Sequence, residues 1–144
     1  MSIEEILNKL GLEFQKMRDR RYVVYVDKGV LKEKIKELSD IVNNELYLSN
    51  ITAIDRPEDN IFELCYNIWI YGKGLVSMRT KIDRSNPVFE SIQDMFPGAF
   101  AHELEVHDLF GIKFEGVDNL WEPAFKPEDM KGVYPLRKDW KVKK

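Results

Sequence analysis

The chain has 144 residues, 44% hydrophobic and 33% charged, which predicts one soluble domain with a real core rather than a disordered or membrane-spanning protein. No apolar run approaches the ~20 residues that cross a bilayer, and the acidic start Met1–Glu5 is unlike a secretory signal, so we expect a cytoplasmic protein. The single cysteine, Cys65, excludes an intramolecular disulfide and any iron–sulfur or zinc site built on several cysteines of this chain.

The formal net charge of −3 is unevenly distributed. Residues 126–144 hold seven Lys/Arg against three Asp/Glu, so this tail carries +4 and the rest of the chain −7. A basic tail can bind nucleic acid, anionic lipid or an acidic protein face, or it can simply be solvated. Lysine and glutamate are abundant and glutamine is nearly absent, which favours a thermophilic source.

Two amphipathic helices are expected in the first third of the chain. Ser2 and Glu5 form a capping box before apolar residues on one helical face, and Gly11 follows as the expected helix end. After a strand at Tyr22–Val26, four apolar residues recur at intervals of three and four and predict a second helix. They are Leu31, Ile35, Leu38 and Val42.

The middle of the chain alternates with the period of a sheet. We expect strands at 46–54, 61–71 and 76–82, with Gly72–Gly74 as the turn of a hairpin between the last two. The alternation places Glu63 and Cys65 outward on the first hairpin strand and Arg79 and Lys81 outward on the second. Cys65 is expected to be inert packing.

Pro87 predicts a short helix at 88–95, and a second helix is expected at 99–109 after the break at Pro97–Gly98. Prolines after Gly111 exclude a long helix there. This order of elements predicts an α+β domain at 1–116, with helices packed on a largely antiparallel mixed sheet, followed by an extended C-terminal arm at 117–144.

The residues offer little catalytic chemistry. His102 and His107 flank two glutamates, but a helical zinc motif needs histidines at i and i+4, and at i+5 the second lies about 140° around the helix. Glu105 and Asp108 are more typical of ion pairs or a helix cap than of a paired-carboxylate site, and His107 is expected to pair with Glu103 one helical turn earlier. We therefore expect no catalytic, cofactor-binding or metal-binding residue in this chain.

Several stretches together resemble the 30-kilodalton subunit family of respiratory complex I, which includes the equivalent subunits of membrane-bound energy-converting nickel–iron hydrogenases. They are Phe96–Ala99, Glu103-x-Glu105, Asp108–Gly116 and Pro135–Asp139. Ile51–Asp55 resembles the family's strand ending in Thr-Ala-x-Asp, and Phe62–Ile82 its central hairpin. The resemblance covers roughly residues 20–140.

Two departures distinguish this chain from the usual family pattern. Leu104 stands where the family usually has arginine between the two glutamates, which removes one interface charge. Residues 117–121 replace the His-Pro-Asp-Leu-Arg-Arg of respiratory members. Both departures make the chain more similar to hydrogenase-type or other archaeal complexes than to quinone-reducing bacterial or mitochondrial ones.

The resemblance implies a non-catalytic assembly subunit on the cytoplasmic side of the membrane, in the peripheral arm of an oxidoreductase complex. Its implied partners are a hydrogenase-like large subunit and a small iron–sulfur subunit, with iron–sulfur clusters and a nickel–iron or quinone site in those partners and no cofactor here. The implied contacts to partners are Glu103, Glu105, Asp108, Phe110, Gly111, Phe114, Trp121, Phe125, Tyr134, Pro135, Leu136, Arg137, Lys138, Asp139 and Trp140.

Three alternatives stay open. The parent complex could be an NADH- or F420H2-dependent quinone-type oxidoreductase, the chain could be a stand-alone enzyme with a site around His102–Asp108, or its basic tail could bind nucleic acid. Within the arm, Arg137 is expected to pair with a carboxylate, either on a partner or among Glu103, Glu105 and Asp108.

Overall fold

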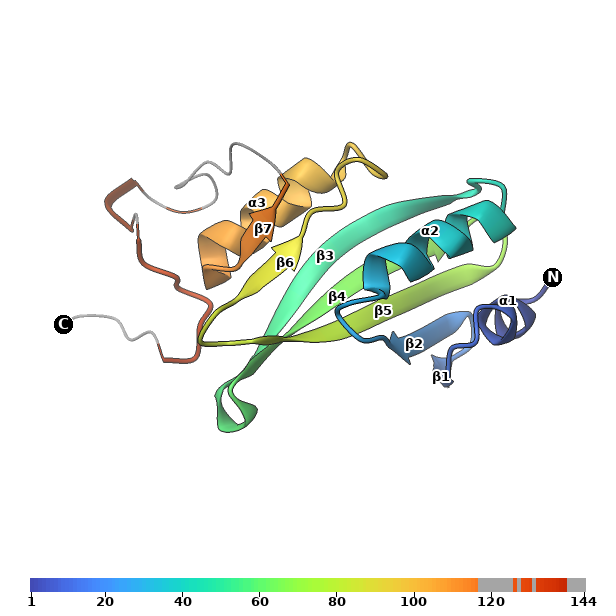
Figure 1. The fold of residues 1–144 in the computed structure, drawn as a ribbon, viewed down its shortest axis with the longest axis horizontal. Helices are drawn as coiled ribbons and strands as arrows, with labels where there is room; N and C mark the ends of the chain where they lie inside the picture. Colours follow the sequence, from blue (N-terminus) through green and yellow to red (C-terminus); the bar gives the residue numbers. More distant parts are fainter. Residues whose placement is uncertain (117–125, 127, 131, 140–144) are drawn as a thin grey trace.

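A computed structural model describes residues 1–116, 126, 128–130 and 132–139. Five strands form one mixed sheet in the order β1-β2-β5-β4-β3, and a second sheet consists of β6 and β7 (Figure 1). The elements in chain order are α1 (Ile3–Lys9), β1 (Phe14–Arg18), β2 (Arg21–Tyr25), α2 (Leu31–Ile41), β3 (Leu46–Arg56), η1 (Pro57–Asp59), β4 (Ile61–Ile70), β5 (Gly74–Asp83), β6 (Val88–Glu90), α3 (Ala99–Phe110), β7 (Lys113–Glu115) and η2 (Glu128–Met130). This architecture confirms the predicted α+β fold.

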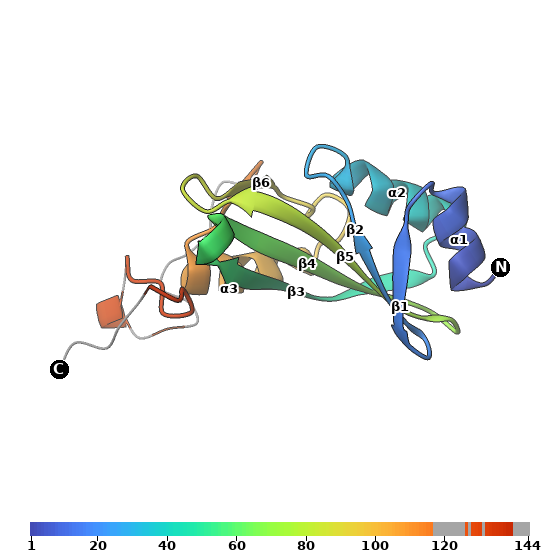
Figure 2. The same ribbon diagram turned by 90° about the horizontal axis from the view of Figure 1, so that it is seen from below.

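The two N-terminal helices form where the sequence predicts them. The Ser2 side chain accepts a hydrogen bond from the Glu5 backbone N–H (3.2 Å), which caps α1. In α2, Leu31, Ile35 and Leu38 are fully buried, so the helix presents one apolar face to the sheet. Both helices lie on the same side of the large sheet (Figure 2).

The large sheet is antiparallel except at one pair. The hairpin of β4 and β5 pairs in an unbroken register, and β3 joins β4 with an irregularity between Leu48 and Asn50. The pairing of β2 with β5 is parallel, and the α2–β3–β4 connection lies between them in the chain. This pair makes the sheet mixed, as expected.

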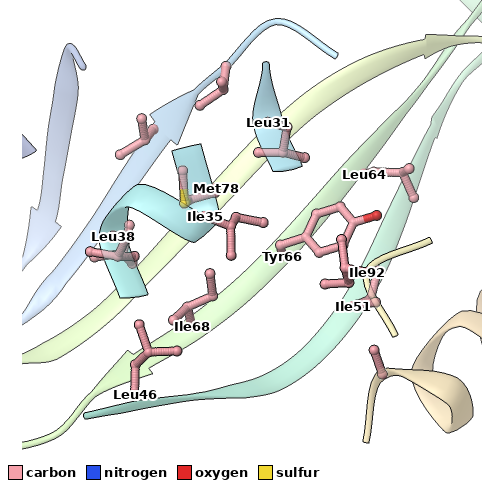
Figure 3. Close-up of a cluster of buried hydrophobic side chains, with 14 of the residues drawn as sticks. Leu31, Ile35, Leu38, Leu46, Ile51, Leu64, Tyr66, Ile68, Met78 and Ile92 are labelled. Atoms are coloured by element: carbon pink, nitrogen blue, oxygen red, sulfur yellow. The ribbon is translucent and has the colours of Figure 1, made fainter. Parts of the chain in front are cut away.

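The core fills the space between the sheet and α2 (Figure 3). Phe62, Leu64, Tyr66, Ile68 and Ile70 point to this side from β4, and all five are 0% exposed. Residues between them face the other side of the sheet, as the alternation predicts. Cys65 is one of these and is buried among its neighbours; burial raises the pKa of its thiol, which disfavours the reactive thiolate.

The segment after Pro87 is not the predicted helix. Residues 88–90 form β6, which pairs in parallel with β7, and a turn follows at residues 93–95. Phe89 and Phe114 are directly paired and both buried, so burial against a strand that is distant in the sequence outweighs the local helix signal. The next helix, α3, matches its prediction and lies beside β3 (Figure 1).

In the part of the chain that the structure describes, no helix is long and apolar enough to cross a membrane.

Candidate partner interface

The carboxylate of Glu103, on α3, binds the loop that follows β6. The residue is 0% exposed, and its carboxylate accepts hydrogen bonds from the backbone N–H of Ile92 (2.9 Å), the hydroxyl of Ser91 (2.8 Å) and the side-chain amide of Gln93 (2.8 Å). These donors, rather than His107, satisfy the carboxylate. Glu103 therefore fixes the path of residues 91–93 against α3.

Asp108 is also buried, near the C-terminal end of α3. The Lys126 ammonium donates to the Asp108 backbone carbonyl (2.8 Å) and the Val133 carbonyl (2.7 Å), and lies 3.6 Å from Asp108 Oδ1. A cation at this end of a helix is favourable because the last carbonyls carry partial negative charge. His107 Nδ1 lies 2.9 Å from the Ile112 carbonyl oxygen, so this nitrogen carries the proton it donates.

Gly111 ends α3 and lets the C-terminal segment, here defined as residues 132–139, approach the helix. Its φ of +79° is the left-handed conformation that favours glycine. A Cβ at this position would lie 2.9 Å from the Tyr134 ring. The Lys126 ammonium also contacts this ring, 4.6 Å from its centroid. The family motif at 108–116 thus contains a glycine against which the C-terminal segment of the same chain packs.

A second anchor for the C-terminal segment is the ion pair of Asp55 and Arg84. Arg84 binds the buried Asp55 carboxylate with two hydrogen bonds, Nε to Oδ1 (2.6 Å) and Nη2 to Oδ2 (3.2 Å). The Lys138 backbone N–H donates to Asp55 Oδ2 (2.7 Å), and Asp139 Oδ2 lies 3.3 Å from Arg84 Nη2. The segment is therefore held at the end of β3 by charge-assisted contacts.

The pKa of Asp55 records this environment. Burial alone would raise the pKa of the carboxyl, but hydrogen bonds from Arg84 and the Lys138 N–H, with the charges of Arg84 and Arg137, lower it below its usual value. The charged form is thus the one that the fold stabilises.

Arg137 does not contact the three acids of α3 in the described residues. Its Nε lies 3.3 Å from Asp139 Oδ1, and its guanidinium lies 5.3 Å from the Phe62 ring centroid. Arg84 also lies over Phe62, at 5.8 Å, so two cations flank one buried ring. Within the described residues, the carboxylate partner of Arg137 is therefore Asp139 and not one of the three acids of α3.

The other predicted interface residues divide by exposure. Phe110 is half-buried and packs edge-on against Phe62 at 6.0 Å, whereas Glu105 and Leu136 are exposed. Pro135 is half-buried, and Lys138 and Asp139 are exposed. Trp121, Phe125 and Trp140 lie outside the described residues. The predicted roles of all these residues as partner contacts stay predictions, as does the boundary between domain and arm at residue 116.

Sequence reasoning missed Ser91 and Arg84, which hold Glu103 and Asp55. Nothing local to either residue signals its role, since the partners are 12 and 29 residues away. The sequence does place Glu103 and Asp55 within apolar elements. An acid that the core encloses needs a hydrogen-bond donor nearby, so these two positions predict that donors exist but not which residues supply them. Among the described residues no group of three His, Cys, Asp or Glu side chains is placed to hold a metal ion.

Residues 24–144 match the family model described as the respiratory-chain NADH dehydrogenase, 30 Kd subunit. The chain therefore belongs to this 30-kilodalton subunit family of complex I-related oxidoreductases, which confirms the resemblance found in the sequence.

Two relatives with known parent complexes are similar to this chain in sequence. The corresponding subunit of the F420H2 dehydrogenase of Methanosarcina mazei is 31% identical over 140 residues, covering 94% of this chain and 83% of that protein. The corresponding subunit of the NADH-quinone oxidoreductase of Moorella thermoacetica is 34% identical over 97 residues, covering 67% of this chain and 64% of that protein.

A solved structure extends the likeness over nearly the whole chain. The structure of the membrane-bound sulfane sulfur reductase, an archaeal respiratory membrane complex, contains a chain with a TM-score of 0.85 at 26% identity, covering 97% of this chain and 84% of that one. A trypsin-resistant fragment of Nqo5 shares the fold, with a TM-score of 0.71.

Proposed function

We propose that the chain is a non-catalytic assembly subunit in the peripheral, cytoplasmic arm of a membrane-bound complex I-related oxidoreductase, and that it docks on a hydrogenase-like large subunit beside a small iron–sulfur subunit. The observation that carries the proposal is the match of 97% of the chain to a subunit of an archaeal respiratory membrane complex. In this proposal the chain reaches the membrane only through its partners, and the redox centres belong to them.

The geometry supports a structural role. The two acids of α3 best placed for chemistry, Glu103 and Asp108, are both 0% exposed and are engaged by donors from the chain itself. A general acid or base must reach a substrate, and a carboxylate enclosed by its own loop does not. The same contacts give α3 and the C-terminal segment a fixed arrangement that a partner can recognise.

For the parent complex we propose an energy-converting hydrogenase or a related ferredoxin-dependent archaeal complex. Two features support this: Leu104, which is buried at 5% exposure where the usual family arginine would carry an interface charge, and the structural likeness to an archaeal complex. The second candidate is an F420H2-dependent quinone-type oxidoreductase, which the 31% identity to the Methanosarcina dehydrogenase subunit favours.

Co-purification tests the function directly. A tagged copy of the chain, expressed in its native host, should recover a large subunit and an iron–sulfur subunit in equal amounts, and the recovered complex should oxidise or reduce a redox dye. Assays of the same complex with hydrogen, reduced ferredoxin or F420H2 as donor would separate the two parent complexes. Turnover by the isolated chain, or its recovery without oxidoreductase subunits, would overturn the proposal.

A further inference from the structure

One side of the large sheet carries neither α1 nor α2 (Figure 2). Outward-pointing side chains of β2 to β5 form this surface, and its basic part, here called the open sheet face, consists of Tyr25, Arg56, Glu63, Arg79 and Lys81. The register places them together, because Tyr25 pairs with Arg79 across β2 and β5, and Glu63 pairs with Lys81 across β4 and β5.

A buried carboxylate organises two arginines at its centre. The Glu63 side chain is 3% exposed; it lies 3.4 Å from Arg56 Nη2 and 4.0 Å from Arg79 Nη1. Arg79 is also fixed by a hydrogen bond from its Nε to the Ser77 hydroxyl (3.1 Å). Each guanidinium has five donors, and these contacts use a minority of them. The two arginine side chains remain 37% and 27% exposed, so further donors face outward from fixed positions.

An exposed aromatic and a lysine extend the same surface. Tyr25 is 52% exposed, and the Lys81 ammonium lies 5.9 Å from its ring centroid. Together with Asp27, Lys28 and Arg79 they line a shallow hollow at the end of β2. Tyrosine and arginine are the residue types enriched in the energetically dominant parts of protein interfaces.

Within the open sheet face, three cations stand against one carboxylate. One carboxylate, Glu63, serves two arginines. At the margins, Asp83 accepts a hydrogen bond from the Ser85 N–H (2.9 Å), and Asp27 accepts one from the Gly29 N–H (2.8 Å), and both keep their negative charge. The excess of cations is therefore confined to Arg56, Arg79 and Lys81, and the acids at the margins reduce it.

We propose that the open sheet face is a docking surface for an acidic surface of a partner protein subunit, with Arg56, Arg79 and Lys81 paired to its carboxylates and Tyr25 packed between them. This inference rests on the proposed function, since it needs a complex in which the chain is a subunit. It differs from the interface expected at α3 and the C-terminal segment, so the chain would contact partners on two sides.

The chemistry favours a protein carboxylate over a nucleic acid. A guanidinium fork matches a carboxylate with two hydrogen bonds, and both arginines here are held in place before binding. Nucleic acid binding needs cations that follow a backbone over many phosphates and gains little from a chain whose overall charge is negative. The patch is compact, with an aromatic at its edge, as in a protein interface.

Zero-length cross-linking of the complex tests the proposal. A carbodiimide joins a lysine amine to a carboxylate in direct contact, so treatment of the complex recovered with the tagged chain should link Lys81 to an Asp or Glu of a co-purified subunit. The matched control is Lys36, an exposed lysine on α2 that lies on the helix-bearing side of the sheet. Acetylation of Lys81 should fall at least about tenfold between free chain and complex, as expected for a desolvated interface charge, and that of Lys36 should not change.

Variants make the result independent of the cross-linker. Lys81→Glu should reduce recovery of the partner subunits by roughly tenfold or more, because it sets like charges opposite one another, whereas Lys36→Glu should leave recovery unchanged. A thermal melt of each free variant controls for folding. Equal acetylation of Lys81 in chain and complex, or binding of random duplex DNA more tightly than polyglutamate, would overturn the inference. Recovery of no oxidoreductase subunit by the wild-type chain would instead overturn the proposed function.

Discussion

The acids of α3 and the cations of the open sheet face show opposite relations between charge and exposure. Glu103 and Asp108 are fully buried and bind donors of their own chain, whereas Arg56 and Arg79 share one buried carboxylate and keep part of their side chains in solvent. The first region uses charge to fix loops, and the second presents charge outward.

This difference bears on how each region can take part in assembly. A buried and satisfied carboxylate contributes to an interface only by holding other groups in place, since exposing it would cost its hydrogen bonds. A fixed and partly exposed guanidinium can bind a partner directly with little loss of side-chain entropy. Substitutions in the first region should therefore lower stability, and substitution of the exposed Lys81 in the second should mainly lower assembly.

The largest effect is expected for Glu103→Ala. The change removes an acceptor from three donors and leaves the buried Ile92 N–H without a partner, so we expect the free energy of unfolding to fall by about 3–5 kcal/mol. Urea denaturation of the free chain measures this. Glu105→Ala, on the exposed side of the same helix, is the matched control and should cost under about 0.5 kcal/mol. Equal losses of stability for the two variants would mean that the burial of Glu103 does not make it more important to folding than the exposed Glu105.

Asp55→Asn should come next, at about 2–4 kcal/mol, because it leaves the nearly buried Arg84 without its carboxylate. The stability that the Asp55 charge contributes depends on pH in a defined direction. The folded pKa of Asp55 lies below the ordinary value of 3.8, so the charge contributes stability that is present above 3.8 and is lost as pH falls through the folded pKa. The difference in urea midpoint between wild type and variant should thus be constant from pH 7 to about 5 and shrink below 3.8.

Trypsin offers a second readout for the same variant. Asp55 accepts a hydrogen bond from the Lys138 N–H, so its loss should free the C-terminal segment and speed cleavage after Arg137 and Lys138. An Asp55→Asn chain cut at the wild-type rate would show that other contacts, such as that of the Leu136 N–H with the Leu109 carbonyl, hold the segment alone.

Gly111→Ala should cost about 2 kcal/mol, part from the left-handed backbone and part from the Tyr134 ring. A double-mutant cycle separates the two contributions. In a Tyr134→Ala background the same change should cost only about 1 kcal/mol, the share of the backbone. Additive costs by thermal or urea denaturation would show that the ring moves aside freely.

The smallest effect on stability is expected for Lys81→Glu in the free chain. The lysine is exposed, but it lies directly opposite Glu63 across β4 and β5, so the change sets two carboxylates side by side and should lower the free energy of unfolding by about 1 kcal/mol or less. A larger loss, measured by the same urea denaturation, would mean that the open sheet face serves folding, and the contrast between the two regions would disappear.

The sequence predicted those parts of the fold in which local pattern and burial agree. The apolar period of α2 and the alternation of β4 and β5 each have one face in the core, so pattern alone located them. Arg79 and Lys81 were correctly expected to point outward for the same reason. The parallel pairing of β2 with β5 depends on residues about 54 apart, and no local pattern indicates it.

The prediction from sequence was wrong where a contact with a distant part of the chain determines the local structure. Residues 88–90 are a strand because β7 pairs with them, although Pro87 resembles a helix start. At the site, the motif located Glu103 and Asp108 but gave no sign that both are buried, because their donors come from the loop after β6 and from Lys126. The open sheet face needs the register of four strands before its cations come together.

The most direct test of the contrast measures two quantities on two variants: the free energy of unfolding of the free chain and the recovery of partner subunits by the tagged chain. Glu103→Gln should lower the free energy of unfolding by about 1–3 kcal/mol, since it keeps the size of the side chain but loses its charge. Lys81→Glu should lose about 1 kcal/mol of stability or less and roughly nine-tenths of the recovered partner, as expected for like charges opposed across the interface. A Lys81→Glu chain that recovers its partners as wild type does would contradict the account.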